Sequence, residues 1–527
     1  MDSKIPSEVS DTLQTNETGD RVPMSPVGVA LLLGSIFIAA ACAIIYQLLI
    51  GTLSSYFLGD SVEQFSLTIG FFLAAMGVGS WASRLFEKNL LSRFIAIELW
   101  LGLTGGCSIP ALYAVYSYSG QYRYWMILSI LIIGGLIGVE LPLLARILRE
   151  YGSLRRVLSD VLSLDYLGAL LAALVFPYLL LPLLGMFNTS LATGAINVII
   201  GITLLWSFRN ILCGGSFIVL SIQAGLSTIF LSVLLVSSED LRAEWEGKLY
   251  SDQIVFSAQS PYQRVVLTEW HEDISLYLGG HLQFSSTDEY RYHEALVHPA
   301  MALAASRDRV LIIGGGDGLS AREVLKYADV GSIDLVDLDP TVTNLAQRDV
   351  RMTRLNNNAL NQPKMRILNE DGFIYLQRAH APYGVIIIDL PDPREDALTK
   401  LYSVEGYRLL RRHLAPGGML VTQATSPYFT RKTFWCIHQT LIHAGFKAVP
   451  YHVPVPSFGE WGFVLANYAD VPALSKVKLS VTTHYLREEL LPHMRIFPPD
   501  MSRIPVHANR LNKPILSEYY RQDWDRW

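Results

Sequence analysis

Three aspartates lie in short stretches rich in glycine or proline that directly follow apolar runs. Asp317 lies among glycines, and Asp389 and Asp392 stand on either side of a Leu-Pro pair. We expect the three carboxylates to line one pocket, because clustered negative charge attracts a polycation and disfavours an anionic substrate. A sulfonium or a diamine would suit such a pocket. The competing interpretation is that Asp389 and Asp392 are ordinary turn residues.

Such a pocket requires strands that end beside one another. From Arg309 onwards, helical stretches alternate with apolar runs, which lie at 310–313, 333–338, 365–368, 384–388 and 418–422. This alternation is typical of a parallel sheet that carries helices on both faces. Ligands of such sheets bind at the carboxyl ends of the strands. We therefore expect a Rossmann-like α/β domain whose site residues follow the apolar runs.

The first of these strands ends in a glycine-rich loop that contains Gly314, Gly315, Gly316 and Gly318. Glycines let the backbone turn tightly and approach a ligand closely. A dinucleotide-binding fingerprint would need a further glycine at position 319, which is Leu. The carboxylate of Asp317 would also repel a pyrophosphate. The loop therefore favours a cationic or neutral nucleoside over a dinucleotide.

Acidic residues also follow the second and third strands. Asp337 is placed to accept hydrogen bonds from ribose hydroxyls. Asp339 precedes a proline, and we expect it to cap the next helix. Asp371 and Gly372 can hydrogen-bond an adenine edge, although Asp371 can instead cap the helix that follows.

The N-terminal half of the chain is much more apolar than the C-terminal half. Charged residues make up only 17% of the chain, against about 25% in an average soluble domain. Only 11 of the 42 Lys and Arg residues lie within residues 1–237. Seven stretches there are long enough to cross the roughly 30 Å hydrocarbon layer. They lie near 27–50, 64–83, 94–117, 124–148, 164–186, 188–208 and 215–237.

These features predict a multi-pass α-helical membrane bundle at 27–237, after a disordered tail at 1–26. Frequent glycines would let its helices pack closely. The lipid bilayer is therefore an expected partner. Nucleic acid is not, because the net charge is -5 and no basic surface stands out.

The charges of the loops conflict with the number of spans. Basic residues gather between spans two and three and between spans four and five, so those loops and the N-terminus should be cytoplasmic. Seven spans would then place the C-terminal half outside, whereas we expect a cytoplasmic catalytic domain at a cell membrane. Either a span is miscounted or re-entrant, or the domain faces outward.

Two acidic residues, Glu140 and Asp165, lie at or near membrane depth. Ionisable groups there are costly and often mark a polar path or a buried pair. The alternative is that each fixes a helix end near the interface.

The C-terminal half divides into three segments. Short alternating runs at 238–298, with a Gly-Gly pair at 279–280, predict a small β subdomain that contains a hairpin. The Rossmann-like domain should occupy 299–470. The extension 471–527 carries no recognisable chemistry, and we expect it to pack onto the α/β domain.

A series of short segments matches one known family in order. The segments are Ser260–Gln263, Leu282–Gln283, Asp288–Glu294, Gly314–Gly318, Val336–Asp339, Asp371–Gly372, Asp389–Pro393 and Pro456–Ser457 followed by Gly462–Phe463. Residues about 255–470 thereby resemble the spermidine synthases, the polyamine aminopropyltransferases. The preceding bundle resembles the membrane-embedded branch of that family.

The resemblance implies a role for each aspartate of the expected pocket. Asp389 would be the proton acceptor, Asp392 would hold the acceptor amine, and Asp317 would bind the amino group of the aminopropyl chain. Asp337 would bind ribose. The remaining implied contacts with substrate are Gln263, His293, Asp371 and Gly372.

Alternatives remain for two of these residues. His293 could be a core histidine, and Gln263 could merely satisfy backbone groups. Family members transfer an aminopropyl group from decarboxylated S-adenosylmethionine to putrescine, which gives spermidine and methylthioadenosine. They use no metal and no prosthetic group, and a homo-oligomer is possible.

The sequence departs from the family pattern in three places. Leu390 and Pro391 replace the usual two serines between the aspartates, Asp337 replaces a common Glu, and Val455 replaces a Tyr that contacts the acceptor. The acceptor can therefore differ from putrescine. Two rival functions are an S-adenosylmethionine methyltransferase and a polyamine transporter or sensor whose α/β domain only binds ligand.

Overall fold

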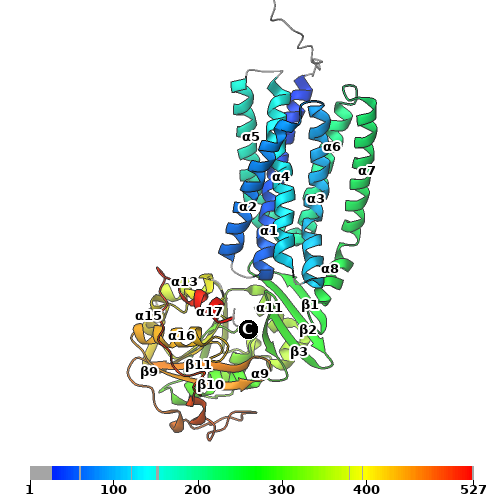
Figure 1. Cartoon of the computed structure of the whole chain (residues 1–527). Coiled ribbons are helices and arrows are strands. Elements are labelled where there is room, and N and C mark those ends of the chain that lie inside the picture. Colours follow the sequence, from blue (N-terminus) through cyan, green and yellow to red (C-terminus); the bar gives the residue numbers. More distant parts are fainter. Residues whose placement is uncertain are drawn as a thin grey trace, which may run out of the picture. The chain divides into compact units, whose positions relative to one another are not determined.

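The structure, a computed structural model, describes residues 26–58, 61–119, 121–149, 154–378, 380–394 and 396–524. It contains two compact units, one helical and one α/β (Figure 1). The helical unit comprises the chain up to Ser55 and Val62–Trp245, and the α/β unit comprises Tyr56–Ser61 and the chain from Glu246. Of the tail expected at 1–26, residues 1–25 lie outside the described residues.

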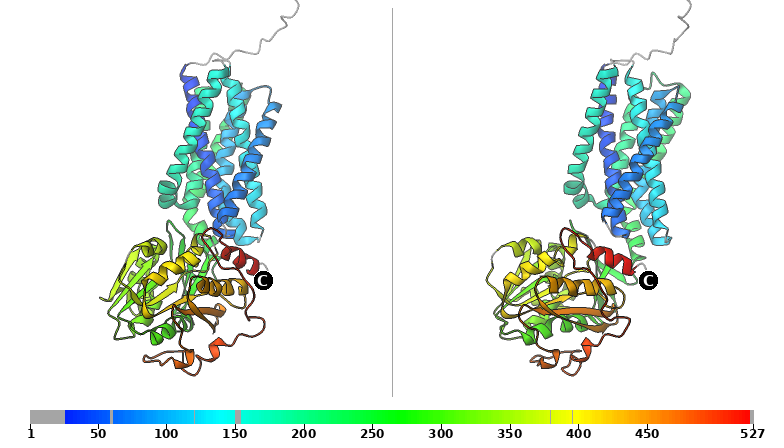
Figure 2. Two further views of the ribbon diagram at one scale, coloured as in Figure 1. Left: turned by 90° about the vertical axis from the view of Figure 1, so that its left-hand side faces the viewer. Right: turned by 60° about the vertical axis from the view of Figure 1, so that its left-hand side comes forward.

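Long helices make up the described part of the helical unit (Figures 1 and 2). They are α1 (Pro26–Leu58), α2 (Ser61–Ala82), α3 (Leu90–Tyr118), α4 (Tyr122–Leu148), α5 (Leu154–Val175), α6 (Leu181–Ser207) and α7 (Gly214–Val236), with the short helices η1 (Ser83–Leu85), η3 (Phe176–Leu180) and α8 (Ser238–Gly247). Six of the seven expected spans each coincide with one long helix. The exception is the span expected at 164–186, which covers the end of α5, η3 and the start of α6.

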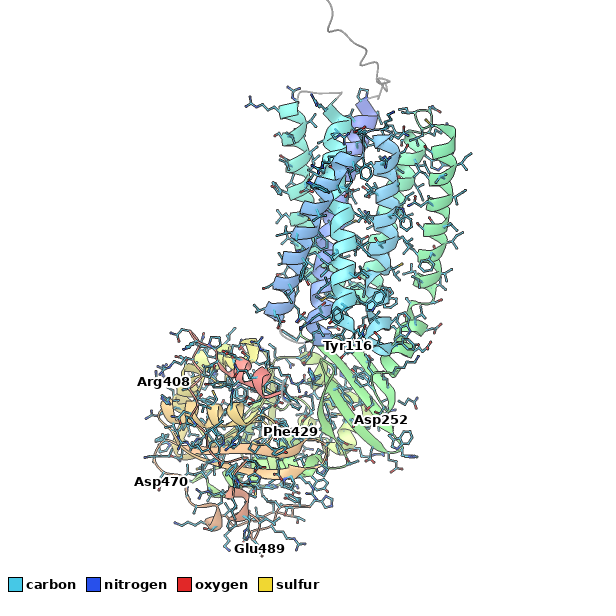
Figure 3. The ribbon with its side chains drawn as sticks, viewed as in Figure 1. Tyr116, Asp252, Arg408, Phe429, Asp470 and Glu489 are labelled. Carbon is cyan, nitrogen blue, oxygen red and sulfur yellow. The ribbon has the colours of Figure 1, made fainter. Side chains whose placement is uncertain are left out.

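Six described segments are long and apolar enough to cross a membrane, judged by length and composition. One of them, Arg155–Ser207, contains α5, the π-helical η3 and α6. Gly185, with a φ of 68°, interrupts this segment, and Figure 1 shows α5 and α6 as separate helices along the bundle. Large apolar side chains project outward from these helices (Figure 3), and examples are Leu73, Leu170, Ile199 and Val219.

Glycines bring helices of this unit into close contact. A Cβ atom at Gly79 on α2 would overlap the carbonyl oxygen of Gly135 on α4, and one at Gly138 would overlap that of Met76. Small residues at such contacts let helix backbones approach one another. The expected close packing through glycine is therefore present between α2 and α4.

A buried polar network lies between the helices of the unit. Glu98, on α3, accepts a hydrogen bond of 2.9 Å from the amide of Asn197, whose carbonyl accepts one of 3.0 Å from Tyr46. Glu140 is buried as well, whereas Asp165 is only half-buried. Glu140 was expected at membrane depth, whereas Glu98 was not singled out from the sequence, although it lies in an apolar run within the expected span 94–117.

The α/β unit begins with a small antiparallel sheet. Its strands, in spatial order, are β1 (Gln253–Gln259), β2 (Arg264–Trp270), β3 (Asp273–Leu278) and β4 (His281–Ser285). The turn between β3 and β4 contains Gly279 and Gly280 at φ values of 57° and 81°. Because positive φ favours glycine, this pair sets the hairpin as expected.

The main sheet has seven strands in the order β10-β11-β9-β8-β5-β6-β7. The strands are β5 (Arg309–Gly314), β6 (Ser332–Asp337), β7 (Met365–Asn369), β8 (Tyr383–Asp389), β9 (Leu414–Gln423), β10 (Lys447–Val455) and β11 (Gly459–Asn467). The strands β5 to β9 pair in parallel, at the five expected apolar runs. The antiparallel edge pair β10 and β11 was not expected from the sequence.

Helices connect the strands, and apolar residues of two core clusters pack between them and the sheet. The helices are α9 (Glu289–Leu303), α10 (Leu319–Leu325), α11 (Pro340–Arg348), α12 (Val350–Leu355), α13 (Gly372–Gln377), α14 (Asp396–Thr399), α15 (Val404–His413), α16 (Arg431–His443) and α17 (Leu516–Trp524). The order β5-α10-β6-α11 places the residues after β5, β6, β7 and β8 along one edge of the sheet.

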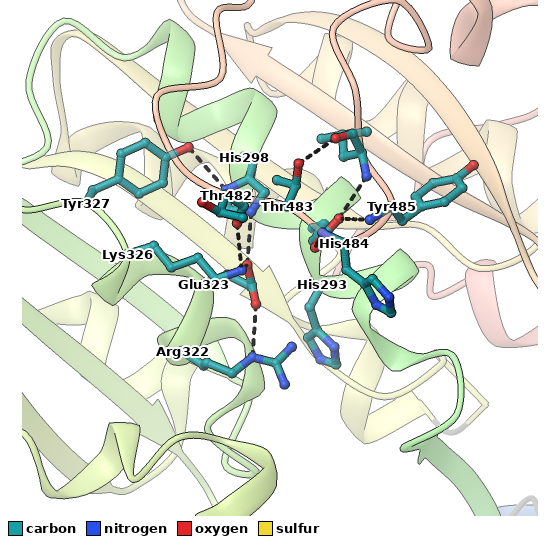
Figure 4. A network of polar contacts seen from close by, with 12 residues as sticks. His293, His298, Arg322, Glu323, Lys326, Tyr327, Thr482, Thr483, His484 and Tyr485 are labelled. Carbon is teal, nitrogen blue, oxygen red and sulfur yellow. Dashed lines mark hydrogen bonds and ion pairs between the residues drawn. The ribbon is translucent and has the colours of Figure 1, made fainter.

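The C-terminal extension packs onto this unit, as expected. Glu294 on α9 is buried and accepts hydrogen bonds from the backbone of His484 and Tyr485, at 2.5 and 2.8 Å. On the same helix, His298 bonds to Glu323 at 2.9 Å, and Figure 4 shows both groups of contacts. Glu294, although it lies in a family segment, therefore holds the extension rather than a substrate.

Replacing Gly79 with Ala should lower the thermal stability of the purified full-length protein. The added methyl group would push α2 from α4, and overpacking of this kind typically costs about 1–3 kcal/mol. Gly77 is the matched control on the same helix, because a Cβ there has open space around it. Equal melting temperatures for Gly79→Ala and Gly77→Ala would contradict the close contact.

Candidate active site

The glycine loop after β5 lies directly against the end of β8. Gly314 pairs with Asp389 in the sheet register, and the Gly315 amide donates a hydrogen bond of 2.9 Å to the Asp389 carbonyl. Gly314 and Gly315 have φ values of 82° and 63°. A Cβ at Gly314 would overlap the Asp389 carbonyl, so this approach requires glycine.

The carboxylate of Asp389 is held by two neutral hydroxyl donors. The Tyr292 hydroxyl on α9 donates to Oδ1 at 2.8 Å, and the Ser320 hydroxyl on α10 donates to Oδ2 at 2.6 Å. Neither donor carries charge, so both orient Asp389 without neutralising it. Neither Tyr292 nor Ser320 was expected from the sequence, although Tyr292 lies within the segment Asp288–Glu294 and Ser320 follows the glycine loop.

Asp317 is half-buried and lies close enough to Asp389 and His293 for their charges to act on it. Its Oδ1 accepts a hydrogen bond of 2.8 Å from the Leu319 amide at the start of α10. Burial raises the pKa of Asp317 to about 6; the charge of His293 opposes this rise and that of Asp389 adds to it. The carboxyl group is therefore sensitive to the cations around it.

His293 supplies a buried positive charge beside these carboxylates. Its Nδ1 lies 2.7 Å from Glu289 Oε2. Burial lowers the pKa of His293, but the hydrogen bond and charge of Glu289 outweigh burial and raise it to about 9. Arg322 makes two further bonds to Glu289, at 2.7 and 2.9 Å. The charges of Asp389 and Asp317 act on His293. His293 is also buried and satisfied by Glu289, as a core histidine would be, so its contact with a substrate stays a prediction.

The end of β6 places Asp337 beneath the glycine loop. Its Oδ2 accepts a hydrogen bond of 3.1 Å from the Gly316 amide, and its Oδ1 accepts one of 2.9 Å from the Asp339 amide. Burial raises the pKa of Asp337 to about 6. Asp339 caps α11 by accepting from Thr341, as expected.

Gln263 lies beside Asp339, which follows the end of β6. Its side-chain amide donates to Asp339 Oδ2 at 3.3 Å, next to Ser260, which donates to that oxygen at 2.7 Å. These bonds join the small sheet to the main sheet. Contact of Gln263 with a substrate stays a prediction.

Asp371 and Gly372 lie at the end of β7, where α13 begins. Asp371 caps that helix by accepting from the amides of Phe373 and Ile374, and it also forms an ion pair with Lys400. The alternative of an N-cap is therefore realised. Recognition of adenine at this position stays a prediction, and Lys400 was not identified from the sequence.

The side chain of Asp392 is 11% exposed, and its two oxygens differ in their contacts among the described residues. Its Oδ2 accepts a hydrogen bond of 2.8 Å from Tyr520, and Arg394 lies 4.0 Å away. Its Oδ1 is buried and has no hydrogen-bond partner among the described residues. Burial raises the pKa of Asp392, whereas the charge of Arg394 lowers it. A buried acceptor of this kind is costly unless a ligand fills it.

The three aspartates of the expected pocket act electrostatically on one another or on the same neighbouring residue. The charges of Asp389 and His293 act on Asp317, and burial together with the charges of Asp389 and Asp392 raises the pKa of Tyr292. The arrangement offers several carboxylates and few compensating cations. It can bind cationic groups and accept a proton from one of them.

The chain is similar to known proteins in sequence and, over part of its length, in structure. Residues 289–475 match the family described as the spermine/spermidine synthase domain. A crystal structure of spermidine synthase from Thermotoga maritima matches 46% of this chain and 84% of its own, at 24% identity and a TM-score of 0.42.

Relatives match almost the entire chain. A polyamine aminopropyltransferase of Leptospira interrogans is 43% identical over 93% of this chain and 98% of its own length. A polyamine aminopropyltransferase of Mycobacterium tuberculosis is 35% identical over 97% of this chain and 99% of its own. The chain therefore belongs to the polyamine aminopropyltransferase family and is an enzyme of that class.

Proposed function

We propose that this enzyme transfers the aminopropyl group of decarboxylated S-adenosylmethionine to a diamine, with putrescine as the expected acceptor. The observation that carries the proposal is the pair Asp389 and Asp392 at the end of β8. Asp389 lies against the glycine loop between two neutral donors, and Asp392 presents a buried, unfilled oxygen.

The proposed reaction is a direct displacement at carbon. The amine nitrogen attacks the propyl carbon, the carbon–sulfur bond breaks, and its electrons remain on sulfur. The sulfonium thereby becomes the neutral thioether of methylthioadenosine. The nitrogen loses a proton to Asp389, and help from a general base is typically worth about 10²–10⁴-fold in rate. Alignment of nitrogen, carbon and sulfur would contribute several kcal/mol more.

The charge of Asp317 explains a preference for the decarboxylated donor. In this proposal Asp317 faces the amino group of the aminopropyl chain, which is attractive. The parent S-adenosylmethionine carries a carboxylate beside that amino group, and two carboxylates at short distance in a buried site repel one another. Asp337 would bind the ribose, and Asp371 with Gly372 the adenine.

We also propose that the helical unit spans a cell membrane. Its long apolar helices and the apolar side chains on their outer surface support this proposal. Basic residues gather at the end of the unit where α1 begins. They are Arg84, Lys88, Arg93, Arg146, Arg149, Arg155, Arg156 and Arg209.

The number of helices then sets the orientation. The basic end should face the cytoplasm. Because α1 begins and α7 ends at opposite ends of the unit (Figure 1), the chain leaves the membrane on the other side. The proposed orientation therefore places the α/β unit outside the cytoplasm, contrary to the cytoplasmic position expected from the sequence.

Replacing Asp389 and Asp392 with Asn should separate their roles. Asp389→Asn should lower kcat by about 10²–10⁴-fold, because the proton acceptor is lost. Asp392→Asn should mainly raise the KM for the diamine, by about tenfold or more, because a charged hydrogen-bond partner is lost. The measurement is release of methylthioadenosine at varied diamine and donor concentrations, with the exposed Asp500→Asn as the control. Unchanged kcat in Asp389→Asn would refute the proposed acceptor role.

Replacing His293 with Gln should shift the acid limb of the pH profile of kcat/KM to higher pH. In the wild type, donor binding should weaken as pH falls through about 6, where Asp317 takes up a proton. The charge of His293 lowers the pKa of Asp317, so its removal should raise that pKa. The exposed His443→Gln is the control. A profile that stays in place would show that His293 does not act on Asp317.

The orientation can be measured with a membrane-impermeant maleimide on intact cells. Cys213 is exposed in the loop between α6 and α7, at the basic end. In Asp500→Cys, a cysteine lies on the surface of the α/β unit. We expect labelling at position 500 and protection of Cys213 until the cells are opened. The reverse pattern would place the catalytic domain in the cytoplasm.

A further inference from the structure

The C-terminal helix α17 reaches the aspartate that is proposed to hold the acceptor amine. Tyr520 on this helix is buried and donates a hydrogen bond of 2.8 Å to Asp392 Oδ2. The contact joins residues 128 positions apart in the chain. No chemistry was expected from the sequence of the extension 471–527, so this contact gives part of the extension a role that the sequence did not indicate.

Helix α17 is firmly attached near its C-terminal end. Asp523 accepts hydrogen bonds from the amides of Lys432 and Thr433, at 2.8 and 3.2 Å, and so satisfies the first turn of α16. Trp524 stacks on Phe429, with ring centroids 5.9 Å apart and an interplanar angle of 6°. These contacts of Asp523 and Trp524 hold the part of α17 that carries Tyr520.

The two carboxylate oxygens of Asp392 differ in their hydrogen bonds. Tyr520 occupies Oδ2, whereas Oδ1 is buried and lacks a partner among the described residues. Arg394 is the nearest cation that forms an ion pair with Asp392, at 4.0 Å, and its guanidinium lies 5.5 Å from the centre of the Tyr520 ring. At that distance Arg394 offsets only part of the charge of Asp392 and does not fill Oδ1.

A tyrosine suits this position because it donates a hydrogen bond without adding positive charge. A Lys or Arg at hydrogen-bond distance would neutralise Asp392 and compete with a cationic ligand. Burial raises the pKa of Tyr520 further above its usual range, so the hydroxyl keeps its proton. The hydrogen bond also favours the ionised form of Asp392.

We propose that Tyr520 is a positioning residue of the acceptor site: it holds Asp392 by Oδ2 so that Oδ1 receives the ammonium group of the diamine. This inference rests on the proposed aminopropyl transfer. The extension thereby completes the site at which the acceptor binds, and the end of α17 contributes to the selection of the amine.

The test compares Tyr520→Phe with Tyr519→Phe in the full-length protein. Tyr520→Phe keeps the ring and removes only the hydroxyl. Tyr519 is its neighbour on α17, and its hydroxyl lies near the backbone of His507 instead. We expect Tyr520→Phe to raise the KM for the diamine by about tenfold or more, with the donor KM and the melting temperature unchanged. Tyr519→Phe should match the wild type.

A second readout uses the protonation of Asp392. Loss of the Tyr520 hydroxyl should raise the pKa of Asp392, so diamine binding by Tyr520→Phe should weaken at a higher pH than in the wild type. Calorimetric titration with the diamine measures this binding without turnover. A purely structural role of Tyr520 would lower the melting temperature and leave this pH dependence in place.

The outcomes separate this inference from the proposed function. Wild-type protein that releases no methylthioadenosine with any diamine would defeat the proposed function. Equal diamine affinity and equal pH dependence in the wild type and Tyr520→Phe would overturn the role of Tyr520 and leave the transfer reaction intact. An equal rise of donor and diamine KM would also overturn it, because the effect would then not be specific to the acceptor.

Discussion

The structure of the site depends on burying several carboxylates close to one another without neutralising all of them. Burial and mutual repulsion both oppose ionisation, and the pKa values of Asp317 and Asp337 rise to about 6 for this reason. Neutral donors, namely backbone amides and the hydroxyls of Tyr292 and Ser320, form hydrogen bonds to the carboxylates of Asp317, Asp337 and Asp389. These donors orient the carboxylates and leave their negative charge for a cationic ligand.

The charged partner His293 is itself held by an ion pair. Glu289 lies between His293 and Arg322 and keeps the histidine protonated. Charges of alternating sign are less costly to bury than like charges, so this row stabilises a cation that the carboxylates can use. The balance still leaves Asp389 and Asp392 short of positive charge, which is the property an enzyme acting on amines requires.

Local patterns predicted the elements of the sheet, and tertiary contacts supplied the residues that were missed. The apolar runs before Gly314, Asp337 and Asp389 correspond to β5, β6 and β8, because a buried parallel strand requires such a run. By contrast, Tyr292 and Tyr520 come from distant helices and meet Asp389 and Asp392 only in the fold. No spacing in the sequence marks such meetings, and the same holds for Lys400 beside Asp371. The edge strands β10 and β11 differ, because alternating residues at 449–455 and an apolar run at 463–466 are a local strand signal.

The two residues between the paired aspartates illustrate how a departure from the family pattern can be accommodated. Leu390 and Pro391 are bulkier than the serines they replace, and their backbone is tied down. The Gln423 amide donates to the Leu390 carbonyl at 2.8 Å, and the Tyr402 hydroxyl donates to the Pro391 carbonyl at 3.4 Å. Leu390 also packs against the core.

Hydrogen bonds to both intervening carbonyls hold the backbone that separates the two carboxylates. Asp389 is therefore directed to Tyr292 and Ser320, and Asp392 to Tyr520. This separation matches a division of labour in which one carboxylate accepts a proton and the other retains a cation. Each carboxylate is thus held by its own neutral hydroxyl donors, and neither depends on the other for a hydrogen bond.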